Sequence, residues 1–380
     1  MAKKIIYLDD AATTPVHPIV VHEMEKFFTK SYGNPSSLHY LGDDALKIIT
    51  EARRKIALEI GCKAHEVVFT SGATESNNLA LHGIARANKN KEKNKILISS
   101  IEHPSVSESA EHLVRQGYLV KKIPVSKEGF VDIDFIKKEI DNKILLVSVM
   151  HVNNVFGTIQ NLKKIGDICR KKRVLFHSDA CQSFGKLKIP VKDWNVDLLS
   201  ISGHKIGGPK GIGALYVRED LDLMPLFFGG GQERGLRSGT ENVPAILGFS
   251  KALEIYKKKD FNKIIMVRDL FIKELEKIGG KINGSSGEGR IFNNIHVSFS
   301  GANAEEMIHR LSEKGIYVSA GSACDSKKQK EDLILKAIGL SEKEARSSIR
   351  ITFDDNISEK EVIRVVGEIK KLLDNNNLFK

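Results

Sequence analysis

Short apolar runs rich in β-branched residues alternate with stretches of helical periodicity from about residue 50 to residue 220. The apolar runs lie at residues 66–70, 96–99, 144–150, 174–178, 198–202 and 213–217. This alternation is typical of βα units that surround a mostly parallel sheet. The pattern therefore predicts an α/β fold for this part of the chain.

A second region follows with a different order of elements. It begins with a helix-like segment at residues 261–278 and continues with strand-like runs at 294–300, 316–321 and 348–353, and a final helix at 358–373. Because single hydrophobic cores stop growing at roughly 250–300 residues, we expect this 380-residue chain to form two domains. We predict a large domain over residues 15–260, and a smaller α+β domain formed by residues 1–14 and 261–380.

Small and polar residues follow five of the apolar runs. The segments are SGATES, SIEHPS, HVNNVFG, DACQS and GHK, in chain order. The carboxyl ends of parallel strands lie at one edge of a sheet, where open α/β sheets bind ligands. These five segments are therefore expected to build a single site.

Composition and charge exclude several classes of protein. The chain carries a net charge of +11, but its lysines are scattered, and the densest run, at residues 88–95, lies in a predicted connector without interleaved aromatic residues. Direct nucleic-acid binding is not expected. No apolar run approaches the roughly 20 residues that span a bilayer, and the first ten residues lack the apolar region of a secretory signal. We expect a cytoplasmic protein without a membrane segment.

The four cysteines are widely spaced, with no CxxC pair and no Cys/His set at zinc spacing. Neither disulfides nor a metal site is expected. Cysteines of this kind are usually buried, but Cys324 lies in a loop rich in glycine and serine. Cys324 is therefore a candidate reactive thiol, and the alternative is an incidental loop cysteine.

Lys205 directly follows the apolar run at 198–202, and the chain has no acidic residue from Leu198 to Tyr216. A lysine held near a buried strand end without a carboxylate partner has a lowered pKa and can form a Schiff base with a carbonyl group. The alternative is a solvated loop lysine. The first interpretation requires a carbonyl cofactor.

The segment at residues 71–74 joins a predicted strand to a predicted helix, so free N–H groups and the helix dipole favour a phosphate there. A simple helix N-cap by Ser71 or Thr74 is the alternative. The chain contains neither GxxxxGK[ST] nor GxGxxG, which argues against a P-loop or a dinucleotide fold.

Asp179 ends a predicted strand, where an inward carboxylate needs a cation, although it could instead cap the next helix. A protonated ring nitrogen would satisfy it. The flat ring of His103 and the amides of Asn154 and Gln182 complete a set that fits pyridoxal 5′-phosphate.

Motifs along nearly the whole chain carry a resemblance to a known family. They are YLDDAATTP (7–15), YGNPSSLH (32–39), VVFTSGATESNNLA (67–80), EHPSV (102–106), VSVMHVNN (147–154), HSDACQSFGK (177–186), SGHKIGGPKGIGALYVR (202–218), GGGQERGLRSGTEN (229–242), GSAC (321–324) and SSIRI (347–351). The chain resembles the pyridoxal-phosphate-dependent cysteine desulfurases of the nitrogen-fixation and iron–sulfur-cluster type. These are fold-type-I enzymes of the class V aminotransferase family, with a mostly parallel seven-stranded sheet in the large domain.

The resemblance implies a role for each matching residue. Lys205 would bond to the cofactor aldehyde and act as the base, and His103 would stack on the ring and take part in proton transfer. Asp179 would pair with the pyridinium nitrogen and Gln182 with the 3′-oxygen. The phosphate would be bound by Ala73, Thr74, Ser202 and His204, and by Thr240 from a second subunit. Arg350, aided by Asn154, would bind the substrate carboxylate. Cys324 would be the nucleophile.

The implied reaction converts L-cysteine to L-alanine and leaves the sulfur as a persulfide on Cys324. The implied partners are a second copy of the chain, in a homodimer, and a sulfur-acceptor protein such as an iron–sulfur scaffold, for cluster assembly or tRNA thiolation or both. A selenocysteine lyase, a fold-type-I aminotransferase and a basic binding protein that keeps only the fold are the alternatives.

The sequence departs from the family pattern at several positions. Val155 stands where relatives carry a carboxylate, Cys181 where they often carry Thr or Val, and Asp354 and Asp355 where a Gly-Arg pair is usual. We expect the first departure to alter hydrogen bonding near the cofactor and the last to alter partner contacts near the mouth of the site. The last helix is followed by few residues, so docking of a scaffold protein through a long tail is not expected.

Overall fold

The structure is a computed structural model that describes residues 5–320 and 333–374. Its larger sheet has seven strands. In spatial order they are β2 (Val67–Thr70), β8 (Gly213–Val217), β7 (Leu198–Ser202), β6 (Leu175–Asp179), β5 (Ile144–Ser148), β3 (Lys95–Ser99) and β4 (Leu119–Ile123). Only β8 runs antiparallel to its neighbours, so the predicted mostly parallel sheet is confirmed.

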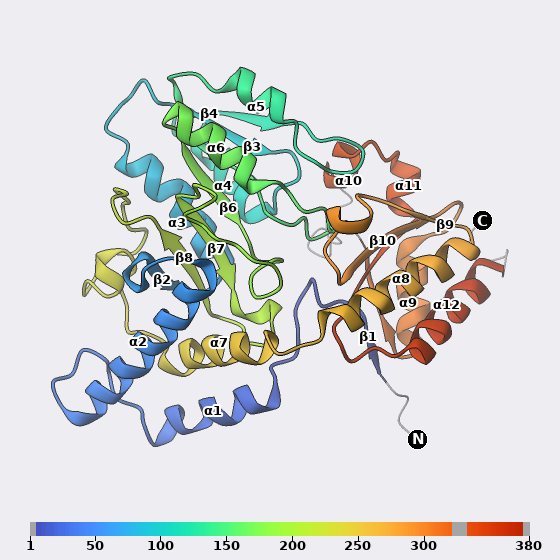
Figure 1. The fold of residues 1–380 in the computed structure, drawn as a ribbon, viewed down its shortest axis with the longest axis horizontal. Helices are drawn as coiled ribbons and strands as arrows, with labels where there is room; N and C mark the ends of the chain where they lie inside the picture. The colour runs from blue at the N-terminus through green and yellow to red at the C-terminus, as the bar shows by residue number, and fades with distance from the viewer. Residues whose placement is uncertain (1–4, 321–332, 375–380) are drawn as a thin grey trace.

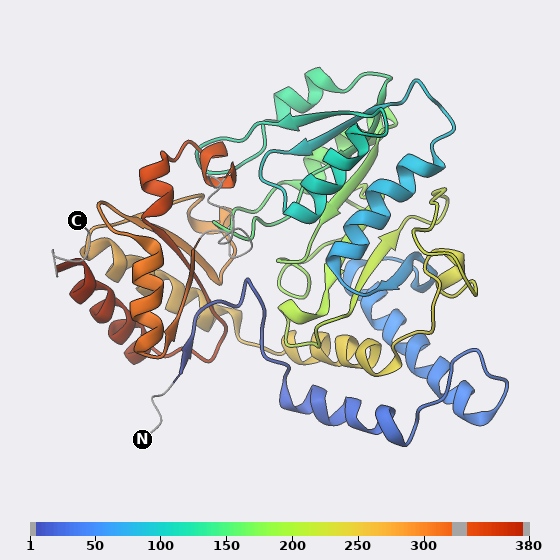
Figure 2. The same ribbon diagram turned by 180° about the vertical axis from the view of Figure 1, so that it is seen from behind.

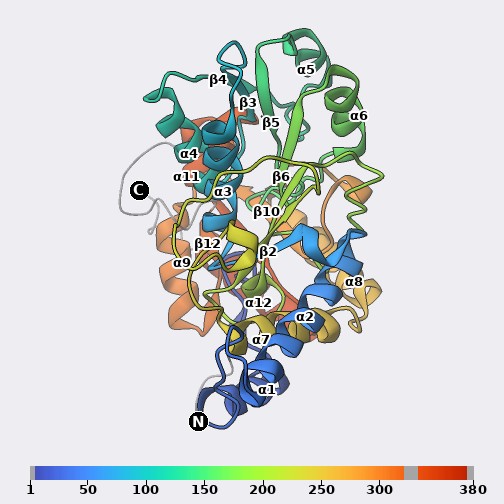
Figure 3. The same ribbon diagram turned by 90° about the vertical axis from the view of Figure 1, so that its left-hand side faces the viewer.

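Helices cover both faces of this sheet, because its strands are apolar on both sides. The helices of this part of the chain are α1 (Pro18–Thr29), α2 (Tyr40–Ile60), α3 (Ala73–Ala87), α4 (Pro104–Val114), α5 (Ile133–Glu139), α6 (Leu162–Lys172) and α7 (Val243–Tyr256). Figure 3 shows α3 and α4 on one side of the strands and α2 and α6 on the other. Alternate strand residues follow this division: Val68 packs with α3 and α4, whereas Val67 and Phe69 pack with α2 and α7.

A second core lies beside the first (Figures 1 and 2). Its four-stranded sheet has the order β12 (Ser319–Ala320), β13 (Ser348–Thr352), β10 (Asn294–Phe299) and β9 (Gly280–Ile282). A separate parallel pair joins β1 (Ile6–Tyr7) to β11 (Ile316–Tyr317). The accompanying helices are α8 (Phe261–Lys277), α9 (Ala304–Glu313), α10 (Leu333–Ala337), α11 (Glu342–Arg346) and α12 (Glu359–Asp374).

The N-terminal segment connects the two cores. Ile6 and Leu8 are fully buried in the second core, and the chain then crosses to α1, which packs against α7 in the first core. The chain crosses back between α7 and α8 (Figure 1). Among the described residues, no helix is long and apolar enough to span a membrane.

Candidate active site

Lys205 ends a short 3-10 turn, Gly203–Lys205, that directly follows β7. Its Nζ atom donates hydrogen bonds to the carbonyl oxygens of Ala11 (2.5 Å) and Ala12 (2.7 Å), and it forms no ion pair among the described residues. Burial lowers the pKa of Lys205 to about 8. The side chain is therefore directed inward, and its amine loses a proton far more readily than a solvated lysine would.

His103 is the N-cap residue of α4. Its Nδ1 accepts the backbone N–H of Ser105 at 3.1 Å and lies 2.8 Å from the Ser105 hydroxyl oxygen. Burial lowers the pKa of His103. The hydrogen bonds assign the single proton of the neutral ring to Nε2, which leaves Nδ1 as an acceptor.

Asp179 is the last residue of β6 and is 5% exposed. One carboxylate oxygen accepts from Asn77 Nδ2 at 2.7 Å and the other from the backbone N–H of Cys181 at 2.9 Å. Asn77 also donates to the Ser105 hydroxyl at 2.8 Å, so hydrogen bonds link Asp179 to His103. Asp179 forms no ion pair within the described part of the chain, so this buried carboxylate calls for a cationic ligand.

The start of α3 has no side-chain cap. Its N-cap residue is Gly72, and the nearby carboxylate of Glu75 instead accepts the backbone N–H of Ser71 at 2.9 Å. The predicted alternative of an N-cap by Ser71 or Thr74 is therefore wrong. Ala73 and Thr74 open the helix, and their N–H groups lie at its positive end, where a phosphate binds favourably.

Strand pairing brings Ser202 close to this helix start. Gly213 of β8 pairs with Ser202 on one side and with Thr70 on the other. A Cβ at Gly213 would lie 2.8 Å from the Cα of Gly72, so only glycine lets β8 approach α3 so closely.

The N-terminal segment orders two further predicted residues. Gln182 Nε2 donates to the carbonyl oxygen of Ala11 at 3.0 Å, and His204 Nδ1 lies 3.0 Å from the Thr13 hydroxyl. Burial lowers the pKa of His204 to about 4, aided by the charge of Lys205. His204 is therefore a neutral hydrogen-bonding residue at ordinary pH.

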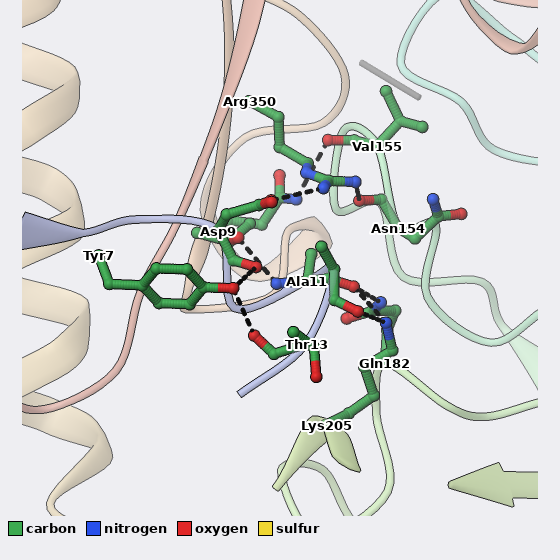
Figure 4. Close-up of polar contacts among 12 residues, drawn as sticks. Tyr7, Asp9, Ala11, Thr13, Asn154, Val155, Gln182, Lys205 and Arg350 are labelled. Carbon is green, nitrogen blue, oxygen red and sulfur yellow. Dashed lines mark hydrogen bonds and ion pairs between the residues drawn. The ribbon is translucent and has the colours of Figure 1, made fainter. Parts of the chain in front are cut away.

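Arg350 projects from β13 of the second core and is 2% exposed. Its Nη2 pairs with Asp9 Oδ1 at 2.7 Å, and its Nη1 donates to the backbone carbonyl of Asn154 at 3.1 Å (Figure 4). Within the described part of the chain, Arg350 Nε and Asn154 Oδ1 are buried and have no hydrogen-bond partner. Arg350 thus has an unused hydrogen-bond donor and Asn154, which it contacts, has an unused acceptor. A polar ligand could pair with both groups.

One predicted residue, Thr240, makes none of the contacts described above. Thr240 is exposed on the surface of the single chain, in a loop that the Arg237–Glu75 ion pair (3.0 Å) ties to the first turn of α3. Cys324 lies outside the described residues.

Reasoning from the sequence missed Asn77, Ser105, Asp9 and Glu102. Asn77 follows Ala73 by one helical turn, and this spacing could have placed it on the same face. Glu102 is buried, and its Oε1 accepts from Ser99 Oγ at 2.5 Å and from the Met150 N–H at 2.7 Å. Burial raises the pKa of Glu102 to about 8, so the carboxyl group holds a proton at neutral pH.

The structure also locates the departures from the family pattern. The Val155 side chain is fully buried with Ile101, Met150 and Leu335, so it adds packing and no polar group. Cys181 is buried too, with its thiol 3.9 Å from the Ser200 carbonyl oxygen.

Asp354 and Asp355 pair with Lys259 at 2.5 and 2.8 Å, where the chain passes from α7 to α8. Burial opposes the charge of Lys259, but the two carboxylates outweigh it and raise its pKa. The two aspartates therefore contact the link between the cores.

Comparison with known proteins gives this geometry its context. A family model described as aminotransferase class-V matches residues 6–365. The chain belongs to the class-V aminotransferase family. Enzymes of this family use pyridoxal phosphate, so the predicted family and cofactor are confirmed.

Two curated relatives illustrate the similarity within this family. The chain is 44% identical over 377 residues to the cysteine desulfurase IscS of Rickettsia africae (strain ESF-5), which covers 97% of this chain and 91% of that protein. It is 43% identical over 381 residues to the cysteine desulfurase IscS 1 of Archaeoglobus fulgidus, with coverage of 98% and 99%.

Solved structures agree with this assignment. A NifS-like protein superposes with a TM-score of 0.92 at 36% identity, covering 98% of this chain and all (100%) of that one. A structure of SspA in complex with cysteine superposes with a TM-score of 0.82 at 37% identity, with coverage of 92% and 99%. The predicted fold type I is confirmed.

The residues fit pyridoxal phosphate on three independent observations. Asp179 is a buried carboxylate that suits a pyridinium nitrogen, the uncapped start of α3 suits a phosphate, and Lys205 offers an amine of lowered pKa to an aldehyde.

Proposed function

We propose that this protein is a cysteine desulfurase, which converts L-cysteine to L-alanine and transfers the sulfur to Cys324 as a persulfide. One observation carries the proposal: Lys205 and Arg350 come from different sheets and bond to the same short segment, Asp9–Ala12 (Figure 4). An amine that reacts with aldehydes and a guanidinium that binds carboxylates are therefore held by one four-residue segment, an arrangement that suits an α-amino acid substrate. Relatives named cysteine desulfurase support cysteine as that amino acid.

Arg350 binds the substrate carboxylate through donors that Asp9 and Asn154 leave unused. Bound pyridoxal phosphate supplies an electron-withdrawing ring that makes the α-proton of an amino acid acidic. The Asp179 carboxylate would stabilise a positive charge on the ring nitrogen of the bound cofactor. The neutral His103 ring keeps an N–H at Nε2 that can donate a hydrogen bond.

Lys205 is the base in this proposal. Its pKa of about 8 leaves a useful fraction of neutral amine, which can take the α-proton. After it gains the proton, the ammonium group has the carbonyl oxygens of Ala11 and Ala12 as acceptors. The proton is thus held at Nζ, ready for return to the product.

The sulfur step balances without an outside oxidant. The Cys324 thiolate attacks the substrate sulfur and forms a sulfur–sulfur bond, while the carbon–sulfur bond breaks and leaves its electron pair on carbon. That carbon takes up a proton to give the methyl group of alanine. The sulfur then passes from Cys324 to an acceptor protein for iron–sulfur cluster assembly, tRNA thiolation or both.

We also propose a homodimer in which Thr240 reaches the phosphate of the partner. Thr240 is exposed in the single chain, as a residue that serves another subunit would be. A groove of about 650 Å³ runs between α3 and α4 from Thr74 to Phe227. Phe227, which lines the groove, is 52% exposed and the next residue, Phe228, is 74% exposed, an apolar surface that a second copy would cover.

The test is production of alanine and sulfide from L-cysteine by the purified protein with pyridoxal phosphate and a reductant. The parent is expected to yield both, whereas Cys324→Ala is expected to yield almost none. Cys62→Ala is the matched control, because burial raises the pKa of this thiol to about 12 and makes it unreactive. Equal sulfide from the parent and Cys324→Ala would reject the persulfide mechanism.

A further inference from the structure

The Arg350 guanidinium is held from two directions before any substrate arrives. Asp9 Oδ1 contacts Nη2 at 2.7 Å, and the Asn154 carbonyl oxygen accepts from Nη1 at 3.1 Å. A guanidinium has five N–H donors, so these contacts leave Nε and one N–H on each Nη atom for a ligand. Nε is buried and has no hydrogen-bond partner among the described residues.

Asp9 is itself fixed to the strand that carries Arg350. Its backbone forms a bridge with Thr352, whose hydroxyl accepts the Ala11 N–H at 2.9 Å. The Tyr7 hydroxyl lies 3.2 Å from the Asp9 carbonyl oxygen and 2.8 Å from that of Thr13, across the turn (Figure 4). The position of the Asp9 carboxylate is thus set by β13 and by the turn that it enters.

The same turn holds the other end of the site. Ala11 and Ala12, two and three residues after Asp9, give their carbonyl oxygens to Lys205 Nζ, and Gln182 Nε2 bonds to Ala11 as well. The segment therefore sets the spacing between a guanidinium of the second core and an amine of the first. An α-amino acid presents its carboxylate and its α-carbon at one fixed separation, which such a spacing can select.

We propose that Asp9 is a positioning residue that aims the free edge of the Arg350 guanidinium at the substrate carboxylate, and so makes the site selective for α-amino acids over amines. This inference rests on the proposed function, in which Arg350 binds that carboxylate. Asp9 touches neither substrate nor cofactor in this account. It acts through Arg350 alone.

The test compares ligands with and without a carboxylate in the cofactor-loaded protein. In Asp9→Asn, the affinity for L-alanine, read from the absorbance of the bound cofactor, is expected to fall about tenfold, because a charge-assisted hydrogen bond is lost. The affinity for 2-aminoethanethiol, which lacks the carboxylate, is expected to stay unchanged. The KM for L-cysteine is expected to rise with little change in kcat.

Asp10→Asn is the matched control. It removes a neighbouring buried carboxylate that interacts with Lys186 and Asp354 and forms no ion pair with Arg350 among the described contacts. Its ratio of the two ligand affinities is expected to equal that of the parent. If Asp9→Asn does not fold, Asp9→Glu keeps the charge but moves the carboxylate by one methylene group, and it is expected to show the same selective loss.

Three results would overturn the inference. Equal loss of affinity for both ligands would show that Asp9 only supports the fold. A lower KM for cysteine would show that Asp9 competes with the substrate for Arg350. Parent-like affinity in every Asp9 variant would show that Arg350 needs no positioning. Failure of the proposed function is a separate outcome, in which the parent releases no sulfide from cysteine while its ligand affinities still report on Asp9.

Discussion

At the scale of single residues, burial moves two groups of opposite charge toward their neutral forms. It lowers the pKa of Lys205 to about 8 and raises the pKa of Glu102 to about 8. The sequence could predict the first shift, because no acidic residue lies between Leu198 and Tyr216. It could not predict the second, because nothing in the segment EHPSV shows that Glu102 is buried, and burial is what raises its pKa.

The shift at Lys205 predicts how cofactor binding depends on pH. Only the neutral amine attacks an aldehyde, and its fraction grows as pH rises through the lowered pKa of about 8. The rate at which the apo-protein takes up pyridoxal phosphate, followed by absorbance, is expected to rise from about pH 6 and level off above about pH 9. Lys210→Ala, which alters a nearby exposed lysine, is expected to keep this profile. A flat profile in the parent would contradict the account.

The shift at Glu102 predicts how stability depends on pH. Between the ordinary value of 4.5 and the folded value of about 8, the native state holds a proton that the unfolded state has lost. Stability therefore falls as pH rises through this window. Glu102→Gln resembles the protonated acid, so its free energy of unfolding in urea is expected to gain on the parent as pH increases.

The exposed Glu111 of α4 supplies the control for that experiment. Glu111→Gln is expected to follow the parent across the whole pH range. A constant difference in unfolding free energy between Glu102→Gln and the parent would mean that Glu102 is ionised in the folded protein.

At the scale of elements, the hydrophobic pattern predicted the buried strands well and the exposed edge strand β4 not at all. The runs that became β5 and β7 are entirely buried, which makes them continuous apolar stretches. β4 pairs only with β3, exposes Lys121 and Lys122, and buries only Ile123, so its sequence has no strand signal. Asp9 and Arg350 are 341 positions apart in the sequence, so no local pattern could predict their contact.

The close approach of β8 to α3 gives a prediction about one glycine. In Gly213→Ala the added methyl group would lie 2.6 Å from the Ile201 carbonyl oxygen and would push against Gly72. We expect a loss of about 1–3 kcal/mol in unfolding free energy, together with weaker pyridoxal phosphate binding, because the start of α3 must shift.

Gly367→Ala is the comparison for this variant. Gly367 lies within α12, and an added methyl group would meet no other element of the described structure within 4 Å. Its stability is expected to rise by about 0.5–1 kcal/mol with unchanged cofactor affinity. If Gly213→Ala binds the cofactor as tightly as the parent does, the start of α3 does not bind the phosphate.

At the scale of the whole molecule, the site forms where two cores meet. Lys205, Asp179 and His103 belong to the first sheet and its helices, whereas Arg350 belongs to the second sheet. The predicted division at residues 14–15 and 260–261 stays a prediction. The packing of Ile6 and Leu8 in the second core supports it.

The homodimer proposal predicts that two defective chains repair each other. Thr240→Asp places a negative charge beside the partner's phosphate, and Lys205→Ala disables a chain's own site. A mixed dimer then contains one site with an intact Lys205 and an intact Thr240 from the other chain. Co-expressed chains, purified through two different tags, are expected to recover activity that neither variant has alone. No recovery would place Thr240 in its own chain's site, and full activity of Thr240→Asp alone would place it in none.

The most direct test of the central claim is a single-turnover measurement with L-cysteine and no reductant. The cofactor-loaded protein is expected to release about one alanine per bound cofactor and then stop, because the sulfur stays on the enzyme. Later addition of a reductant is expected to release an equal amount of sulfide. Pyruvate and ammonia in place of alanine, or alanine without recoverable sulfur, would contradict the assignment as a cysteine desulfurase.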